Sequence, residues 1–214
     1  MSRAPHFDQR PRSQLDRERY LHTRYGGLQS FVDRIEQRLV YAMLDRLETR
    51  PRRVLDAPSG HGRFTPALRE LATDSLVCMD GSQRRLATLK ESESGPGTPF
   101  ETRIVNLEER LPFEDGEFDL VFCFRYFHHV ADAELRRRVV TELLRVSNQY
   151  ALLSYYDSVS LHYFQKILLR QKRIAFQRRR EVADLANAAG WKVREDRAPL
   201  PLVHGQRIVA LEKR

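Results

Sequence analysis

The chain has 214 residues, of which 41% are hydrophobic and 31% are charged, and its formal net charge is +8. This length suits one well-buried α/β domain and is short for two, and the composition is ordinary for a soluble globular protein. No run approaches the roughly 18 apolar residues of a membrane-spanning helix. The basic, polar start lacks the apolar stretch of a secretory signal, so we expect a cytoplasmic protein.

The positive charge is concentrated in one segment. Between Leu161 and Arg180 the chain carries seven lysines and arginines and no acid, which accounts for seven of the eight net charges. This pattern predicts one cationic surface rather than a generally basic protein. The two cysteines, Cys78 and Cys123, lie inside short apolar runs, so we expect reduced core thiols and no metal site.

The N-terminal part divides in two. Residues 1 to about 19 are rich in arginine, proline and acids and predict a mobile arm. From Phe31 to Arg50, apolar residues recur at helical spacing and predict an amphipathic helix on the core, ended by Pro51. The residues of this stripe are Phe31, Ile35, Leu39, Met43 and Leu47.

After this helix, short apolar runs alternate with helical patterns. The predicted strands are 53–57, 75–80, 100–106, 117–124, 150–156, 191–197 and 207–213, and the predicted helices are 64–72, 82–92, 132–147 and 181–190. Strands joined by helices predict right-handed crossovers and an α/β fold with a doubly wound, mostly parallel sheet. The last two strands have no helix between them, so we expect them to pair antiparallel.

The stretch VLDAPSGHGRF, residues 54–64, has the pattern of a strand, a tight turn and a helix start. A dinucleotide-binding turn needs a third glycine where this chain has Thr65, and a phosphate-binding loop needs a lysine followed by serine or threonine. Asp56 would repel a phosphate but suits a cationic ligand such as S-adenosylmethionine, and Asp80 can accept hydrogen bonds from ribose hydroxyls. Alternatively, both acids are favoured by the dipoles of the helices that follow.

Four segments in order resemble the motifs of the class I S-adenosylmethionine-dependent methyltransferases of the methyltransferase type 11 group. They are VLDAPSGHGRF, VCMDGS, NLEERLPFEDGEFDLVFCF and FHHV. The resemblance covers about residues 35–155, and AGWKV with the terminal hairpin extends it to the end. It implies a Rossmann-like, seven-stranded sheet with an antiparallel last strand in a domain of residues 31–214. It also implies a methyltransferase that uses S-adenosylmethionine and releases S-adenosylhomocysteine.

The resemblance also implies the cofactor contacts. Asp56 and the turn after it fall at the methionine end, Asp80 at the ribose, and Asn106 and Leu107 at the adenine. Pro58 stands where the family usually has its first glycine, which removes one amide donor, and Asn106 replaces the usual aspartate but keeps an acceptor. We interpret both as tolerated variants. The expected cofactor-binding residues are Asp56, Ala57, Pro58, Ser59, Gly60, Gly62, Asp80, Gly81, Asn106, Leu107 and Phe124.

The residues after the fourth and fifth predicted strands are candidates for chemistry, because ligands bind at the carboxyl ends of such strands. A neutral His128 or His129 can accept a proton near the transferred methyl group. Alternatively, one histidine packs and the other caps the next helix. Arg125 is a candidate for holding an acidic substrate or the cofactor carboxylate, and Tyr155 and Tyr156 are candidates for lining an acceptor pocket.

Two further segments are expected to cover the site, as in relatives. Residues 1–30 are a possible lid with Tyr20 and Tyr25 as contacts, and residues around 156–180 are a basic substrate-covering insertion. In this insertion Phe164, Ile167, Leu168 and Ile174 keep roughly helical spacing, with cations on another face. The basic residues of 166–180 are candidates for contact with anionic lipid or nucleic acid, or they form a solvated helix face.

The leading hypothesis is methyl transfer to oxygen or nitrogen of a small-molecule, anionic or lipid-linked acceptor. The alternatives are a non-catalytic module that keeps the fold and holds a partner through its basic segment, and an RNA methyltransferase. The sequence shows no Asn-Pro-Pro-Tyr-type motif after the fourth strand, where it reads Phe-Arg-Tyr-Phe. Oligomeric state is not indicated.

Overall fold

The computed structural model describes residues 28–93, 97–169 and 174–214, and it contains a seven-stranded sheet in the order β3-β2-β1-β4-β5-β7-β6. The strands are β1 (Arg53–Asp56), β2 (Ser75–Asp80), β3 (Phe100–Ile104), β4 (Phe118–Cys123), β5 (Ser147–Tyr156), β6 (Trp191–Arg197) and β7 (Gln206–Lys213). The five strands β1 to β5 are parallel, whereas β7 pairs antiparallel with both β5 and β6. The predicted fold class and the predicted terminal hairpin are confirmed.

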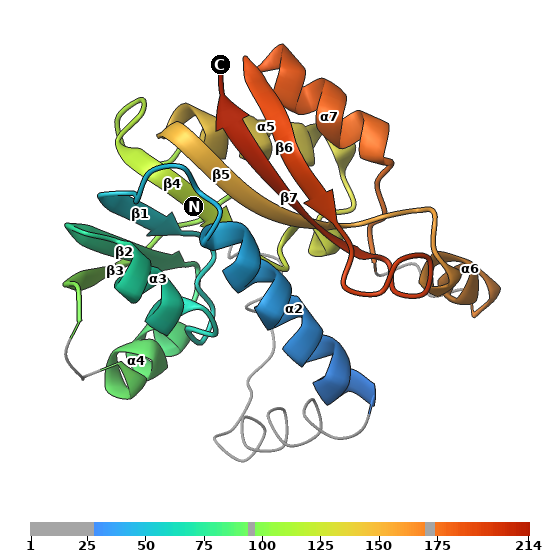
Figure 1. Cartoon of the computed structure of the whole chain (residues 1–214), viewed down its shortest axis with the longest axis horizontal. Helices are drawn as coiled ribbons and strands as arrows, with labels where there is room; N and C mark the ends of the chain where they lie inside the picture. Colours follow the sequence, from blue (N-terminus) through green and yellow to red (C-terminus); the bar gives the residue numbers. More distant parts are fainter. Residues whose placement is uncertain (1–27, 94–96, 170–173) are drawn as a thin grey trace, which may run out of the picture.

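Helices cover both faces of this sheet (Figure 1). The helices of the described residues are α2 (Leu28–Leu44), α3 (Thr65–Leu71), α4 (Gln83–Ser92), α5 (Ala133–Arg145), α6 (Leu161–Leu168) and α7 (Arg179–Ala188), with a 3₁₀ turn η1 (Phe127–His129). Among the described residues, no helix has the length and apolar character needed to cross a membrane.

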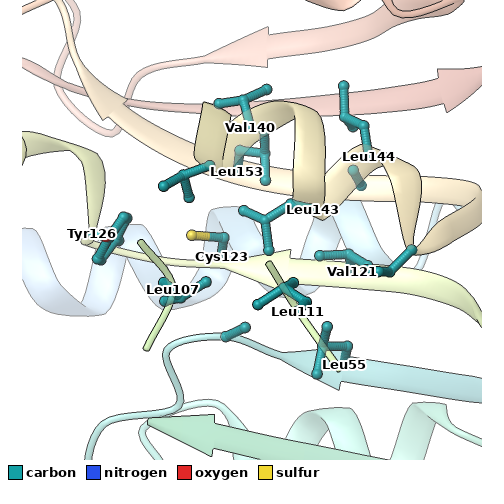
Figure 2. Close-up of a cluster of buried hydrophobic side chains, with 14 of the residues drawn as sticks. Leu55, Leu107, Leu111, Val121, Cys123, Tyr126, Val140, Leu143, Leu144 and Leu153 are labelled. Carbon is teal, nitrogen blue, oxygen red and sulfur yellow. The ribbon is translucent and has the colours of Figure 1, made fainter. Parts of the chain in front are cut away.

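The side chains of β4 alternate between two buried clusters. Leu120 and Phe122 pack in the cluster that α2 covers, whereas Val121 and Cys123 pack in the other one. Figure 2 shows Val121 and Cys123 beside Leu143 of α5. Both cysteines are free and buried, which agrees with the prediction of core thiols.

Helix α2 differs from the predicted helix in its end and in its buried face. It ends at Leu44 rather than Arg50, and Glu48 beyond its end accepts a hydrogen bond from Arg194 of the edge strand β6. The expected stripe is also wrong at its start, since Phe31 is 49% exposed. The buried face instead includes the two acids Asp33 and Glu36, which an apolar pattern does not reveal.

The basic insertion is less helical than its sequence predicted. Helix α6 ends at Leu168, and Ile174 lies outside it in an irregular segment. Residues 170–173, with three of the cations, lie outside the described part of the chain. The segment 174–177 instead bonds to η1 and to the end of β5, since the Ala175 amide donates to the His128 carbonyl (2.8 Å) and the Gln177 amide to that of Tyr156 (2.7 Å).

The strand order determines where a ligand can bind. The carboxyl ends of β1, β2, β4 and β5 meet at one edge of the sheet, and the antiparallel β7 begins at this same edge, with Gln206 opposite Tyr156. The chain moves from β1 outward to β2 and β3, then returns to β4 on the other side of β1. Ligands bind outside such a reversal point in open α/β sheets.

Candidate cofactor and acceptor site

The glycine turn after β1 is held between the two neighbouring strands. The amide of Ala57 donates to the carbonyl of Phe122 on β4 (2.9 Å), and the amide of Ser59 donates to that of Met79 on β2 (2.8 Å). Pro58 lies between these two anchors and is preceded by a cis peptide bond. The turn therefore keeps its backbone bonds on both sides of the residue that lacks an amide donor.

The two glycines of this turn serve different purposes. Both have positive φ, +59° at Gly60 and +79° at Gly62, which favours glycine. A Cβ atom at Gly62 would overlap the side chain of Leu89 on α4, so this glycine permits close helix packing. At Gly60 a Cβ atom would meet nothing within 4 Å, so the backbone there is open to a ligand.

Asp80 ends β2 beside this turn and is fully buried. Its carboxylate accepts hydrogen bonds from the amides of Gly60 (3.1 Å) and Ser82 (2.9 Å), and from Arg85 (3.4 Å). Burial raises the pKa of Asp80, and Arg85 and the two amides oppose this effect. Asp80 thus joins the glycine turn to the start of α4.

Asp56 lies at the end of β1 and is 2% exposed. Burial, and then repulsion from Asp80, raise the pKa of Asp56 to about 8. Two buried carboxyl groups in such proximity favour a bound cation, because a cation lowers the cost of ionising both. The hydroxyl of Ser59 is buried in the same turn and has no hydrogen-bond partner.

The remaining expected cofactor residues lie at the ends of β3 and β4. Asn106 stabilises its own turn, since its side chain accepts from the Glu108 amide (3.1 Å) and donates to Glu109 (3.2 Å). Leu107 is buried in the core (Figure 2). Phe124 is 8% exposed and packs edge-to-face on Phe64.

Arg125 follows β4 and belongs to a cluster of four charges. Its Nη2 donates to Asp33 Oδ1 (2.5 Å) and to Glu36, both on α2. Arg63, just after the glycine turn, donates to the same Glu36 (2.9 Å) and to the Asp33 carbonyl (2.8 Å). These four side chains, called here the charge cluster, balance to zero net charge and tie α2 to both strand ends. Sequence reasoning missed three of them, Asp33, Glu36 and Arg63.

The expected catalytic histidines lie on η1 beside the end of β5. The ring centroids of His128 and His129 are 3.9 Å apart, and His128 lies edge-on to Tyr156 at 4.8 Å. Asp132, not a histidine, caps α5, since it accepts from the Glu134 amide (2.8 Å). The alternative of a capping histidine is therefore wrong.

Tyr156 is the centre of an aromatic group that sequence reasoning largely missed. His162, Phe176 and His204 lie within 6 Å of its ring, centroid to centroid. We call these four residues with His128 the Tyr156 cluster. Its members come from η1, β5, α6, the segment 174–177 and the loop before β7, so only the tertiary structure brings them together.

Two histidines of this cluster, His162 and His204, have lowered pKa values. Burial, then repulsion from His162 and Arg125, lower the pKa of His204 to about 4, and burial lowers that of His162. The Nδ1 atom of His204 accepts from the Gln206 amide (3.3 Å), which leaves the His204 proton on Nε2. The cluster is therefore polar, and burial disfavours a positive charge on His162 and His204.

Tyr155 does not join this cluster, because neighbouring side chains of a strand point to opposite faces. Its hydroxyl donates to Asp196 of β6 (2.8 Å), and burial followed by repulsion from Asp196 raises its pKa. The other two expected tyrosines, Tyr20 and Tyr25, lie outside the described residues, as does most of the arm 1–30.

Comparison with known proteins agrees with this geometry. Residues 55–153 match the methyltransferase domain family. An uncharacterized methyltransferase of Synechocystis sp. is 31% identical over 121 residues, which are 55% of this chain and 54% of that protein. The match thus spans about half the length of this curated relative.

Solved structures share the fold at low identity. The Synechocystis magnesium protoporphyrin IX methyltransferase with bound S-adenosylhomocysteine has a TM-score of 0.70 at 15% identity over 94% of each chain. The Burkholderia thailandensis 1,6-didemethyltoxoflavin-N1-methyltransferase has a TM-score of 0.64 at 16% identity, covering 96% of this chain and 92% of its own. The fold is that of the class I S-adenosylmethionine-dependent methyltransferases. Residues 55–153 match the methyltransferase domain family, and the chain as a whole shares the fold of these enzymes.

Proposed function

We propose that the protein transfers a methyl group from S-adenosylmethionine to oxygen or nitrogen of a small-molecule or lipid-linked acceptor. The observation that carries this proposal is the pair of buried acids, Asp56 and Asp80, beside an open glycine turn at the reversal point of the sheet. Two acids at the turn attract a cationic cofactor, whereas a nucleoside triphosphate would need a lysine, which the turn lacks.

We assign each part of S-adenosylmethionine to residues at this edge. Asp56 would hold its cationic methionine end, Asp80 its ribose hydroxyls, and the Ser59 hydroxyl and the open face of Gly60 would contact the bound molecule. The turn at Asn106 and Leu107 would lie near the adenine and Phe124 near the reacting end. When bound, the cofactor supplies a methyl group on a sulfonium for in-line attack by the acceptor. The protein's part is to align the acceptor and exclude water.

We infer that His128 is the proton acceptor when the acceptor atom carries a proton. His128 lies on η1, which follows β4, and contacts Tyr156, whereas His129 is exposed. Arg125 is already paired with two carboxylates, so we assign it to holding α2 rather than to binding an anionic substrate. We propose that Tyr156 contacts the methyl acceptor and that Tyr155 does not.

The first experiment is a calorimetric titration with S-adenosylmethionine and S-adenosylhomocysteine. Micromolar binding supports the cofactor site, and no binding by folded protein would sink the proposal. Methyl-labelled S-adenosylmethionine is then incubated with the protein and separated fractions of a cell extract. Label in small molecules or lipids supports the proposed enzyme, label in RNA indicates an RNA methyltransferase, and no transfer indicates a binding module.

We further propose that helix α6 contacts an anionic lipid surface. None of its residues is buried, and its apolar side chains Leu161, Phe164, Ile167 and Leu168 are each more than half exposed. Leu202 and Val203 extend this surface, since their carbonyls accept from the amides of Leu161 (2.7 Å) and His162 (3.2 Å). An exposed apolar surface followed by a run of cations is typical of interfacial binding. Nucleic-acid binding is the other outcome of the test, and a cytoplasmic location stays a prediction.

A further inference from the structure

Gln206, the first residue of β7, has a buried carboxamide without a hydrogen-bond partner at either end. The residue is 1% exposed, and neither its Oε1 nor its Nε2 makes a hydrogen bond. Most buried polar side chains in proteins are bonded, so a buried amide with two unsatisfied atoms requires an explanation. The backbone amide of Gln206 does have a partner, because it donates a hydrogen bond to His204 Nδ1.

The pairing of the strands places this amide beside the Tyr156 cluster. Gln206 lies directly opposite Tyr156 in the antiparallel pair of β5 and β7, and side chains opposite each other point to the same face. Two other buried atoms around this point also lack partners, His162 Nδ1 and Gln177 Nε2. The unsatisfied atoms therefore belong to three residues that each neighbour Tyr156 through a strand pair, a ring contact or a backbone bond.

The charges around Gln206 favour an uncharged ligand. The pKa values of His162 and His204 are lowered, and Arg125, the cation that acts on His204, is paired with Asp33 and Glu36 in the charge cluster. The Gln206 carboxamide offers an N–H donor and a carbonyl acceptor side by side. A ligand that bonds to both must therefore carry an acceptor next to a donor. Lactams, cyclic imides and primary amides have this pattern.

The width of the sheet limits the size of the ligand. Gln206 is two strands away from β4, which is roughly 10 Å at the usual strand spacing. A molecule that bonds Gln206 and also reaches the expected methyl position therefore needs a length of about two fused rings. The aromatic members of the Tyr156 cluster favour a flat molecule of this size.

We propose that the Gln206 carboxamide binds the methyl acceptor through a pair of hydrogen bonds, and that the acceptor is an uncharged, flat molecule of at least two rings with a lactam-type edge. This inference rests on the proposed methyltransferase function and specifies its substrate class. Gln206 is then a residue that determines specificity, while the methyl group reacts at the far end of the acceptor.

The test compares two probes of equal shape on the protein saturated with S-adenosylhomocysteine. One is 2-quinolone, a neutral bicyclic lactam, and the other is coumarin, in which a ring oxygen replaces the N–H donor. Ligand-observed NMR is expected to show binding of the first and at least about tenfold weaker binding of the second, because the second leaves a buried group unpaired. Equal binding of the two probes would overturn the proposal, as would no binding of either.

Two variants separate recognition from folding. Gln206→Leu removes both polar atoms at similar volume, and Gln165→Leu is the control at an exposed glutamine of α6. We expect Gln206→Leu to lose the preference for 2-quinolone while its Tm rises by roughly 2–4 °C, since an unsatisfied buried amide is removed. A lower Tm with unchanged probe preference would assign Gln206 to structure and overturn the proposal. If S-adenosylhomocysteine itself does not bind, the proposed function fails first.

Discussion

The carboxylate of Asp80 accepts a hydrogen bond from the Gly60 amide across 3.1 Å, so the end of β2 holds the glycine turn that follows β1. This single contact brings together an acid and an open glycine from segments 20 residues apart. It brings a hydrogen-bond acceptor next to the open backbone of Gly60, which is the arrangement that the proposed function uses.

Replacing Asp80 by alanine is expected to weaken the binding of S-adenosylhomocysteine at least about 100-fold, because two charge-assisted bonds to the ribose are lost. The control is Asp74→Ala at the opposite end of β2, where the side chain is 43% exposed. Calorimetry measures both affinities, and circular dichroism checks that both variants fold. Binding by Asp80→Ala within threefold of the wild type contradicts the ribose assignment.

Binding of S-adenosylmethionine at pH 7 is expected to release a proton. The pKa of Asp56 is about 8 in the free protein, so its carboxyl group is mostly protonated at pH 7. A cation bound beside it favours the ionised form and lowers this pKa, so about 0.9 proton is released per cofactor at most. Titrations in phosphate and in Tris buffer measure this release, because the two buffers differ in ionisation enthalpy. Equal binding enthalpies in both buffers would exclude Asp56 as the partner of the cation.

The two glycines of the turn are expected to respond differently to alanine. Gly62→Ala should lower stability by more than about 2 kcal/mol, since it adds an overlap with Leu89 to the strain of positive φ. Gly60→Ala should cost only about 1 kcal/mol and act mainly by weakening cofactor binding, because only the ligand would meet its Cβ atom. Urea unfolding and calorimetry separate the two effects. Equal losses of stability would show that Gly60 has no separate role in binding.

The charge cluster is expected to be costly to break. Glu36 is fully buried and pairs with Arg63 and Arg125, so Glu36→Ala leaves two arginines partly uncompensated and should destabilise the protein by about 3 kcal/mol. The control is Asp184→Ala, whose ion pair with Arg180 is exposed and contributes little. Urea unfolding measures both changes, and similar values for the two variants would contradict a structural role of the cluster.

Helix α6 is expected to bind vesicles that contain phosphatidylserine and not vesicles of phosphatidylcholine alone. The double variant Phe164→Ser with Leu168→Ser should bind at least about tenfold more weakly, because two side chains no longer insert. Val193→Ser, on the partly exposed β6, is the control. Sedimentation with vesicles measures the binding. If the protein binds a 30-nucleotide RNA and does not bind vesicles, the partner of this surface is nucleic acid and not lipid.

The amino-acid sequence by itself determined the order and type of the elements and the two acids of the candidate cofactor site. Local signals suffice there, since strand ends, the glycine turn and the acids are close in sequence, as in VLDAPSG at 54–60 and VCMD at 77–80. The antiparallel hairpin of β6 and β7 was predictable for the same reason, because no helix separates them.

Only the tertiary structure determined which residues form the acceptor side of the candidate site. Asp33 and Arg125 are 92 residues apart, and Gln206 meets Tyr156 only because β7 enters the sheet beside β5. A periodic pattern counts apolar residues and so misses Glu36, which faces the core because two distant arginines neutralise it there. Tyr155 and Tyr156 are adjacent in the chain, yet the pleat of β5 directs one to Asp196 and the other to the cluster of histidines.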